Sequence, residues 1–242
     1  MMPAFWKPED CHIHIGAEAN LAPTLPDWVA TKVFRQDLTQ PGFACLSLSG
    51  QVDSFQLRRT MAWLKEQLSN IFQTDHGQTL AYYSLGRFDQ KKTTRLHLDG
   101  GPTCSFLMLG YEPSAVTSRF LISDYSRCAA DLGLSPHEFL EHQNPMFTQE
   151  GREALQPYTQ ALPRWHDGQN RIVILNNSSL PASSPLPGLG ILHGAEVLNI
   201  PSPGTPRIIN STLFVPQPEA PAETAEALKT FLETDAISGQ IL

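Results

Sequence analysis

Short runs of apolar and β-branched residues, each ended by a turn signal, dominate the hydrophobic pattern of this chain. The runs lie at 43–48, 79–85, 94–98, 104–109, 119–123, 171–175, 190–192, 196–200 and 207–215. Turn sequences such as Asp99-Gly100-Gly101-Pro102 and Pro203-Gly204 separate them. This punctuation is typical of a β-sandwich or barrel, and it argues against regularly alternating strands and helices.

Two segments carry a helical pattern instead. In 55–72, Leu57, Met61, Leu64 and Leu68 recur at helical spacing, and Asp53 or Ser54 is placed to cap the first turn. A second amphipathic pattern covers 221–234. Each has one apolar face, so we expect both helices to lie on the outside of a sheet.

The stretch 124–168 interrupts the β pattern with four prolines and two short helical pieces. We interpret it as an insertion between two core strands, which either shapes substrate access or is a packed surface excursion. The expected organisation is one domain, 1–242. In it, 1–78 form an N-terminal strand and helix support, 79–215 the barrel core with the insertion, and 216–242 a C-terminal helix.

Composition narrows the classes of protein. Of the 242 residues, 17 are basic and 24 acidic, and the net charge of −7 comes without a basic cluster, which disfavours nucleic-acid binding. No apolar stretch is long enough to span a bilayer, and no signal peptide is visible. The four cysteines are scattered, so we expect free thiols. A cytoplasmic protein without a membrane partner is the resulting expectation; the oligomeric state stays open.

The candidate chemistry lies in His97-Leu98-Asp99, taken together with His193 and Arg207. Side chains two apart on a strand point to the same face, so His97 and Asp99 are expected to lie together. With His193 they make two imidazoles and one carboxylate, the ligand set of non-haem Fe(II) oxygenases, in which half of the octahedron stays open. The set contains no thiolate, so a structural zinc site is disfavoured.

These residues, in this order, resemble the signature of the 2-oxoglutarate/Fe(II)-dependent dioxygenases. His97-Leu98-Asp99, Leu192-His193-Gly194 and Arg207 carry the resemblance, which covers about residues 79–215; Asn176-Asn177 upstream of Leu-His-Gly is also similar. The resemblance implies a double-stranded β-helix, also called a jelly roll or cupin-like barrel. It further implies Fe(II) held by His97, Asp99 and His193, with 2-oxoglutarate and O₂ as cosubstrates.

By the same resemblance, Arg207 pairs with the far carboxylate of 2-oxoglutarate, a task that suits a guanidinium with two parallel donors. Many members carry a hydroxyl two residues after this arginine, but here that residue is Ile209. Ser211, Tyr83 and Thr103 are the alternatives for the second carboxylate contact. The intact Asp99 favours hydroxylation over halogenation. The substrate, a small molecule or a protein side chain, stays open.

Two other functions compete with this hypothesis. His12 and His14 in Asp10-Cys11-His12-Ile13-His14 resemble the first-strand motif of metal-dependent amidohydrolases, which are α/β barrels. The rest of the chain lacks their alternation of strand and helix. A cupin-like binding module without turnover is the second competitor, and Arg207 distinguishes it, because a binding barrel needs no cation for a dicarboxylic cosubstrate.

Overall fold

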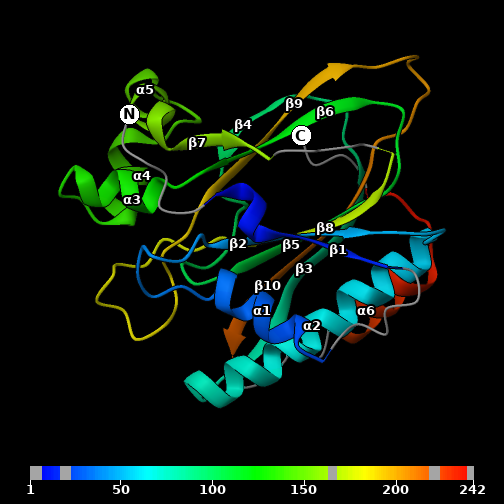
Figure 1. Ribbon diagram of the computed structural model, residues 1–242, viewed down its shortest axis with the longest axis horizontal. Coiled ribbons are helices and arrows are strands. Elements are labelled where there is room, and N and C mark those ends of the chain that lie inside the picture. Colours follow the sequence, from blue (N-terminus) through cyan, green and yellow to red (C-terminus); the bar gives the residue numbers. More distant parts are fainter. Residues whose placement is uncertain (1–6, 17–22, 163–167, 218–223, 239–242) are drawn as a thin grey trace.

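Two β-sheets face each other in the computed structural model, which describes residues 7–16, 23–162, 168–217 and 224–238 (Figure 1). The larger sheet has the strand order β1 (His12–Ile15), β2 (Phe43–Leu48), β8 (Asn170–Asn176), β5 (Phe106–Tyr111), β10 (Ile208–Gln217) and β3 (Thr79–Asp89). The smaller sheet has the order β4 (Thr94–His97), β9 (Leu192–Asn199), β6 (Thr117–Ser123) and β7 (Thr159–Ala161).

The path of the chain from β3 to β10 defines the fold. Successive strands alternate between the two sheets, except that β6 and β7 both lie in the smaller one. All pairings among these strands are antiparallel. This winding is a double-stranded β-helix, so the prediction of a mainly β jelly roll with flanking helices is confirmed. It differs from the α/β barrel that an amidohydrolase would need.

Helices cover the outer face of the larger sheet. They are α1 (Leu25–Val33), α2 (Ser54–His76) and α6 (Thr224–Glu233), and Figure 1 shows them below this sheet. Alternate residues of β2 divide between the two faces: Ala44 and Leu46 pack towards the helices, and Phe43 and Cys45 pack between the sheets. The helices cover one face of the larger sheet and the smaller sheet covers the other, so every residue of β2, β5 and β8 is buried.

The long helix α2 has defined ends. Asp53 caps it in a reciprocal pair with Gln56, whose side chain accepts from the Asp53 backbone N–H. At the other end Gly77 adopts a φ of 72°, the left-handed conformation that glycine takes without strain. The helix therefore continues to His76, beyond the 55–72 expected from the apolar spacing.

The excursion between β6 and β7 contains α3 (Tyr125–Asp131), α4 (Pro136–Gln143), α5 (Gln149–Leu155) and the short 3₁₀ helix η2 (Gln156–Tyr158). It lies at one end of the barrel (Figure 1). A separate apolar cluster holds it together and includes Tyr125, Phe139 and Leu192, with Leu96 and Leu98 packed against it. Of the segment 124–168 taken as an insertion, 163–167 lie outside the described residues. The excursion thus packs behind the strands that carry His97 and His193.

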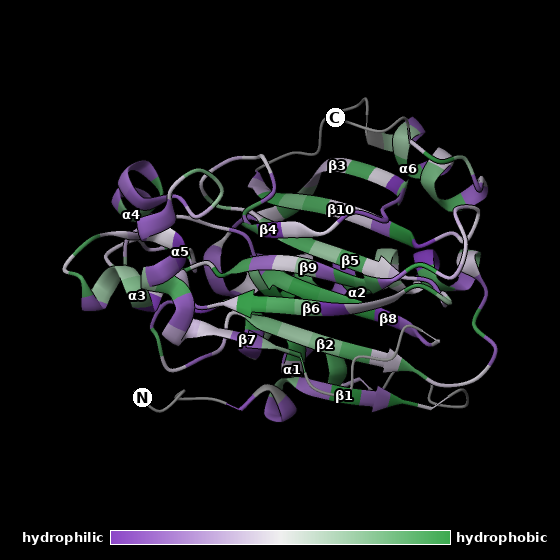
Figure 2. Ribbon diagram, turned by 90° about the horizontal axis from the view of Figure 1, so that it is seen from above, coloured by the Kyte–Doolittle hydropathy of each residue, from purple (hydrophilic) through white to green (hydrophobic). Residues whose placement is uncertain are grey.

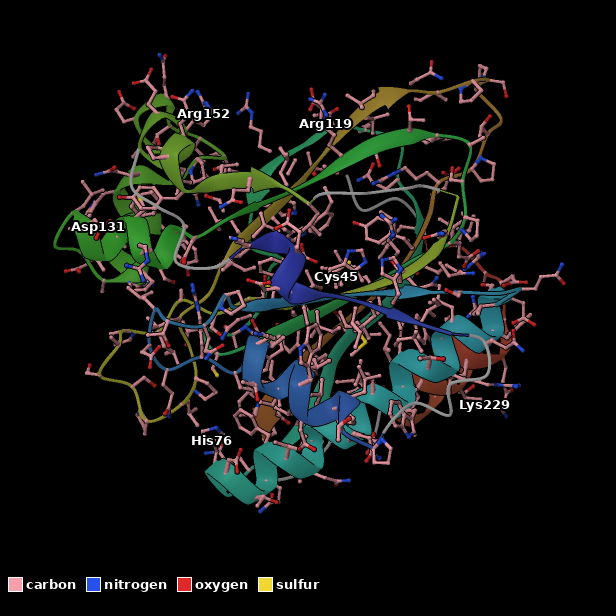
Figure 3. The ribbon with its side chains drawn as sticks, in the orientation of Figure 1. Cys45, His76, Arg119, Asp131, Arg152 and Lys229 are labelled. Atoms are coloured by element: carbon pink, nitrogen blue, oxygen red, sulfur yellow. The ribbon has the colours of Figure 1, made fainter. Side chains whose placement is uncertain are left out.

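Hydropathy follows this architecture. Figure 2 shows hydrophobic residues along the strands of both sheets, and hydrophilic residues on α4 and α5. In Figure 3, Cys45 lies between the sheets, whereas Arg119 lies on the outer side of the smaller sheet. No helix in the described part of the chain combines the length and the apolar character needed to cross a bilayer.

Candidate metal centre

His97 and His193 are brought together by strand register. His97 is the last residue of β4, and its cross-strand partner on β9 is His193. Directly opposed residues of an antiparallel pair place their side chains on the same face. The two imidazole rings accordingly lie with centroids 4.4 Å apart, on the inner side of the smaller sheet.

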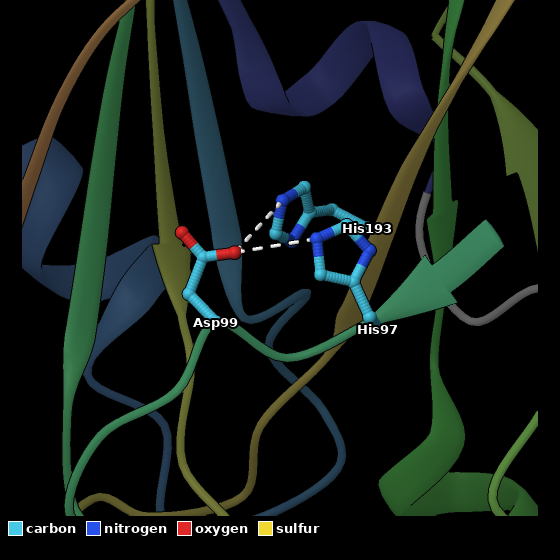
Figure 4. Close-up of side chains that lie close together, drawn as sticks. All are labelled: His97, Asp99 and His193. Atoms are coloured by element: carbon cyan, nitrogen blue, oxygen red, sulfur yellow. Dashed lines mark ion pairs between the residues drawn. The ribbon is translucent and has the colours of Figure 1, made fainter. Parts of the chain in front are cut away.

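Asp99 completes the group from the loop that follows β4 (Figure 4). Its Oδ1 lies 3.3 Å from His97 Nε2 and 3.7 Å from His193 Nε2. In the described ranges this is the one set of three His, Cys, Asp or Glu side chains whose ligand atoms lie within 4.8 Å of one another. Neighbouring ligands of an octahedral ion at ~2.1 Å lie about 3 Å apart. The donor set and its spacing therefore fit a divalent first-row metal.

The protonation states also suit a metal. Burial, with the nearby His97, lowers the pKa of His193 to about 4, so this imidazole is neutral at physiological pH. Burial alone would lower the pKa of His97, but hydrogen bonds with Asp99 and the Arg95 carbonyl raise it. Burial alone would raise the pKa of Asp99, but His97 and His193 lower it. The result is an ionised carboxylate beside a neutral His193.

One nitrogen of each imidazole is oriented toward Asp99. His97 Nδ1 donates to the Arg95 carbonyl oxygen at 2.7 Å, so Nε2 is the nitrogen that faces Asp99. Nε2 donates to the Asp99 carboxylate in the charged ring and presents a lone pair once that proton is lost. His193 Nδ1 is buried and has no hydrogen-bond partner in the described part of the chain. Fixing one ring nitrogen by a second hydrogen bond is how proteins orient a ligating histidine, and His97 shows this arrangement.

A cavity of about 140 Å³ opens beside the three side chains. It lies between the two sheets and is mostly apolar. Its lining residues are Phe88, Gln90, Thr94, His97, Asp99, Leu109, Tyr111, Phe120, His193, Ala195, Arg207, Ile209 and Ser211. A largely apolar pocket with a few convergent polar groups is the usual form of a small-molecule site.

Arg207 lies in this cavity, immediately before β10, and is 1% exposed. Its guanidinium donates to the Gln90 carbonyl at 2.9 Å and to Ser118 Oγ at 3.2 Å, and lies 5.3 Å over the Tyr111 ring. Within the described residues no carboxylate forms an ion pair with it, and its Nε has no hydrogen-bond partner. Asp89 accepts from the Arg207 backbone N–H through Oδ1 at 2.9 Å, and its Oδ2 pairs with Lys91 at 3.1 Å. The buried Arg207 guanidinium thus has no carboxylate at ion-pair distance among the described residues, which suits it to an anionic ligand.

The three side chains considered for a second carboxylate contact have different positions. Ser211 lines the cavity on the same face of β10 as Arg207 and Ile209. Tyr83 does not: it is 55% exposed, because a β-bulge skips it between the pairs Leu213–Ser84 and Phe214–Tyr82. Thr103 is also exposed and outside the cavity lining, in the loop before β5. Of the three side chains, Ser211 is thus the one that lies at the cavity, and Tyr83 and Thr103 lie away from it.

His12 and His14 lie on β1, at the edge of the larger sheet. Their rings are 4.7 Å apart, His12 Nε2 shares a 2.7 Å hydrogen bond with Ser47 Oγ, and His14 is exposed. No carboxylate joins them in a group of three potential ligands within the described part of the protein. Together with the jelly-roll fold, this removes the support for an amidohydrolase centre.

Sequence reasoning did not identify Gln90, Ser118 and Tyr111, the groups that contact Arg207. Gln90 contributes a backbone carbonyl, which no sequence pattern indicates. Ser118 had a usable signal, since it lies two residues before Phe120 and four before Ile122, and strand alternation places all three on one face, which the structure shows to be buried. Tyr111 ends a strand that is buried throughout, so periodicity does not assign it to a face.

Comparison with known proteins finds similarity of fold only. No family model matches the chain, and no curated protein matches its sequence. Solved structures of the iron and alpha-ketoglutarate-dependent endoperoxidase NvfI are similar at 13% identity, with a TM-score of 0.40, covering 76% of this chain and 81% of that one. A single-residue variant of the same enzyme gives 13% identity and a TM-score of 0.40, with coverages of 78% and 80%.

Proposed function

We propose that this protein is an Fe(II)- and 2-oxoglutarate-dependent oxygenase that hydroxylates a small molecule or a protein side chain. One observation carries the proposal. Two histidines and an aspartate converge on one side of a cavity, and the same cavity is lined by a buried arginine whose guanidinium has no carboxylate partner among the described residues. A metal-binding barrel without turnover would need the three ligands, but it would not need the buried Arg207 in the same cavity.

His97, Asp99 and His193 would hold the iron. They offer two neutral nitrogens and one negative oxygen, a hard and borderline donor set that suits Fe(II) and leaves positions open. Bound Fe(II) with 2-oxoglutarate supplies the oxidising chemistry, in which O₂ is consumed, 2-oxoglutarate becomes succinate and CO₂, and one oxygen atom enters a C–H bond. The chain's own contribution is to hold the ligands in place and to orient the cosubstrate in a mainly apolar cavity that limits water.

Arg207 would bind the far carboxylate of 2-oxoglutarate. Its guanidinium is permanently charged, and the Gln90 carbonyl, Ser118 Oγ and the Tyr111 ring hold it in one orientation. Ser211 is the proposed second contact to this carboxylate, since Ile209 brings no hydroxyl and Ser211 lines the same cavity. The net charge of −7, without a basic cluster in the sequence, supports a substrate other than nucleic acid.

Anaerobic titration tests the proposal. The apo protein is titrated with Fe(II) and then with 2-oxoglutarate, and the expected result is a visible metal-to-ligand charge-transfer band that appears only when both are present. Succinate release in air then serves to screen substrates. Folded protein that binds Fe(II) but gives neither band nor 2-oxoglutarate affinity would indicate the binding barrel instead. Protein that binds no Fe(II) would refute the metal centre.

A further inference from the structure

Asp99 lies beyond the strand pairing that positions its two partners. The pairing of β4 with β9 ends at His97, and Asp99 follows in a loop that continues into Gly100 and Gly101. Glycine imposes little restriction on the backbone, and nothing lies within 4 Å of where a Gly100 side chain would begin. A carboxylate in such a loop needs another constraint if it is to face two imidazoles.

The side-chain amide of Asn177 provides that constraint. Asn177 Oδ1 accepts a hydrogen bond from the Asp99 backbone N–H at 2.9 Å. Asn177 Nδ2 donates to the Asp99 backbone carbonyl at 3.0 Å. One side chain thus holds both backbone polar groups of Asp99, as a neighbouring strand would.

Asn177 follows directly after β8 and is held by Ser105, the residue before β5. It is 3% exposed, and its backbone N–H donates to the Ser105 carbonyl at 2.9 Å. Ser105 Oγ accepts from Asn177 Nδ2 at 3.0 Å and lies 3.1 Å from the Asn177 carbonyl, to which it donates. Asn176, the residue before it, pairs with Phe106 in the β5–β8 ladder. The amide therefore has a fixed position relative to two buried strands of the larger sheet, and its hydrogen bonds to Asp99 restrict the backbone of the loop.

We propose that Asn177 is a positioning residue of the metal centre, which fixes the backbone of Asp99 so that its carboxylate faces His97 and His193. The inference rests on the proposed function, since it assigns Asn177 a role toward the metal. An amide suits the task because it combines one acceptor with donors in a single short side chain, whereas a carboxylate or an aliphatic group lacks one or both. Loss of a group that orients a metal ligand from behind typically weakens metal binding about 10- to 100-fold.

The neighbouring Asn176 is a matched control. It is also buried, and its side chain also makes three hydrogen bonds: it donates to the carbonyls of Val33 and Pro187, and it accepts from the Ser178 N–H. None of these bonds involves Asp99. Asn176→Ala therefore removes a comparable set of contacts from the same segment without touching the ligand loop.

Titration of the apo protein with Co(II), followed by its visible spectrum, tests the inference. We expect Asn177→Ala to weaken Co(II) binding about 10- to 100-fold and to alter the Co(II) spectrum, while Asn176→Ala does neither. Asn177→Leu, which keeps the branched shape and the number of heavy atoms, should match Asn177→Ala and guards against an effect of the space that alanine leaves. Wild-type affinity in both Asn177 variants overturns the inference, and so does equal weakening in Asn176→Ala.

A second readout needs no metal. Hydrogen exchange of the Asp99 amide should accelerate in both Asn177 variants and stay unchanged in Asn176→Ala, because only Asn177 accepts from that amide. If exchange of the Asp99 amide is unchanged in the Asn177 variants, Asn177 does not hold the Asp99 backbone, and the inference is overturned. Failure of the wild-type protein to bind Co(II) would instead refute the metal centre and the role of Asn177 toward it together, which separates the two failures.

Discussion

His97 and His193 are direct cross-strand partners, with their ring centroids 4.4 Å apart, although one ends β4 and the other lies near the start of β9. This pairing makes the distance between the two imidazoles a property of sheet register. The register of β4 on β9 is irregular between Thr94 and His97, so the local His97–His193 pair, and not an unbroken ladder, sets which faces the two strands present at the site. Two of the three candidate ligands therefore lie on strands of the smaller sheet, and the third, Asp99, lies on a loop.

Removal of a proposed ligand should abolish metal binding without unfolding the protein. We expect His193→Ala and Asp99→Ala to weaken Fe(II) or Co(II) binding by more than about 100-fold, beyond the effect of groups that only orient ligands. Isothermal titration under anaerobic conditions measures this. His14→Ala is the control, since His14 is an exposed histidine on β1 and should leave the affinity unchanged. If instead His14→Ala weakened metal binding and the other two variants did not, the result would support the amidohydrolase hypothesis.

Replacement of Arg207 should separate cosubstrate binding from metal binding. Arg207→Ala is expected to raise the dissociation constant of 2-oxoglutarate at least about 30-fold, because loss of a buried charge pair costs ~2 kcal/mol or more. The metal affinity should be unchanged, and Arg207→Lys should recover part of the loss by retaining the charge. Arg119→Ala is the control, as Arg119 forms an exposed ion pair with Glu196 on the outer face. Equal loss of metal and cosubstrate would indicate misfolding rather than a binding role.

Glu112 should make the protein sensitive to acid. Burial alone would raise the pKa of this carboxyl, but hydrogen bonds from Arg87, Ser54 and Asn210 lower it below its ordinary value of 4.5. A lowered folded-state pKa stabilises the protein above that ordinary value, and the contribution is lost as the pH falls through the folded-state pKa. Denaturant unfolding of wild type between about pH 5 and about pH 3 should show this loss.

The matched variant for this test is Glu112→Gln, which keeps the shape but cannot ionise. At neutral pH it should be less stable by about 1–3 kcal/mol, since hydrogen bonds to a charged group are lost or weakened. Its unfolding free energy should fall less steeply with acid than that of wild type. Parallel pH profiles for the two proteins would show that Glu112 does not contribute to the acid sensitivity.

Two phenylalanines of the insertion should differ sharply in their effect on stability. Phe139 is fully buried in the cluster behind β4 and β9, whereas Phe147 is 81% exposed. Phe139→Ala should lower the free energy of unfolding by about 3–5 kcal/mol, through lost burial and the cavity left behind. Phe147→Ala should change it by no more than about 0.5 kcal/mol. Chemical denaturation of both variants measures the difference, and similar small values would contradict the packing described here.

The chemistry-bearing residues of the centre could be named from the sequence because their signals are local. Strand periodicity predicts a shared face for His97 and Asp99, and the two side chains do converge. The structure places Asp99 in the loop after β4, however, where hydrogen bonds with Asn177 and not strand alternation position it. Arg207 and Ser211 share a face of β10 for the same reason. Tyr83 lies away from the cavity because a β-bulge skips it and breaks the alternation of β3. The sequence gives no indication of that bulge.

The sequence by itself thus determined the strand-rich character of a sandwich or barrel and the donor types available, because both depend on residue identity and on spacing over a few positions. Tertiary structure alone decided that His193 pairs with His97, and that Asn177 clasps the backbone of Asp99. It also decided that no carboxylate of the described residues neutralises Arg207. These contacts join segments far apart in the chain, and their register follows from packing of both sheets at once, which no local pattern encodes.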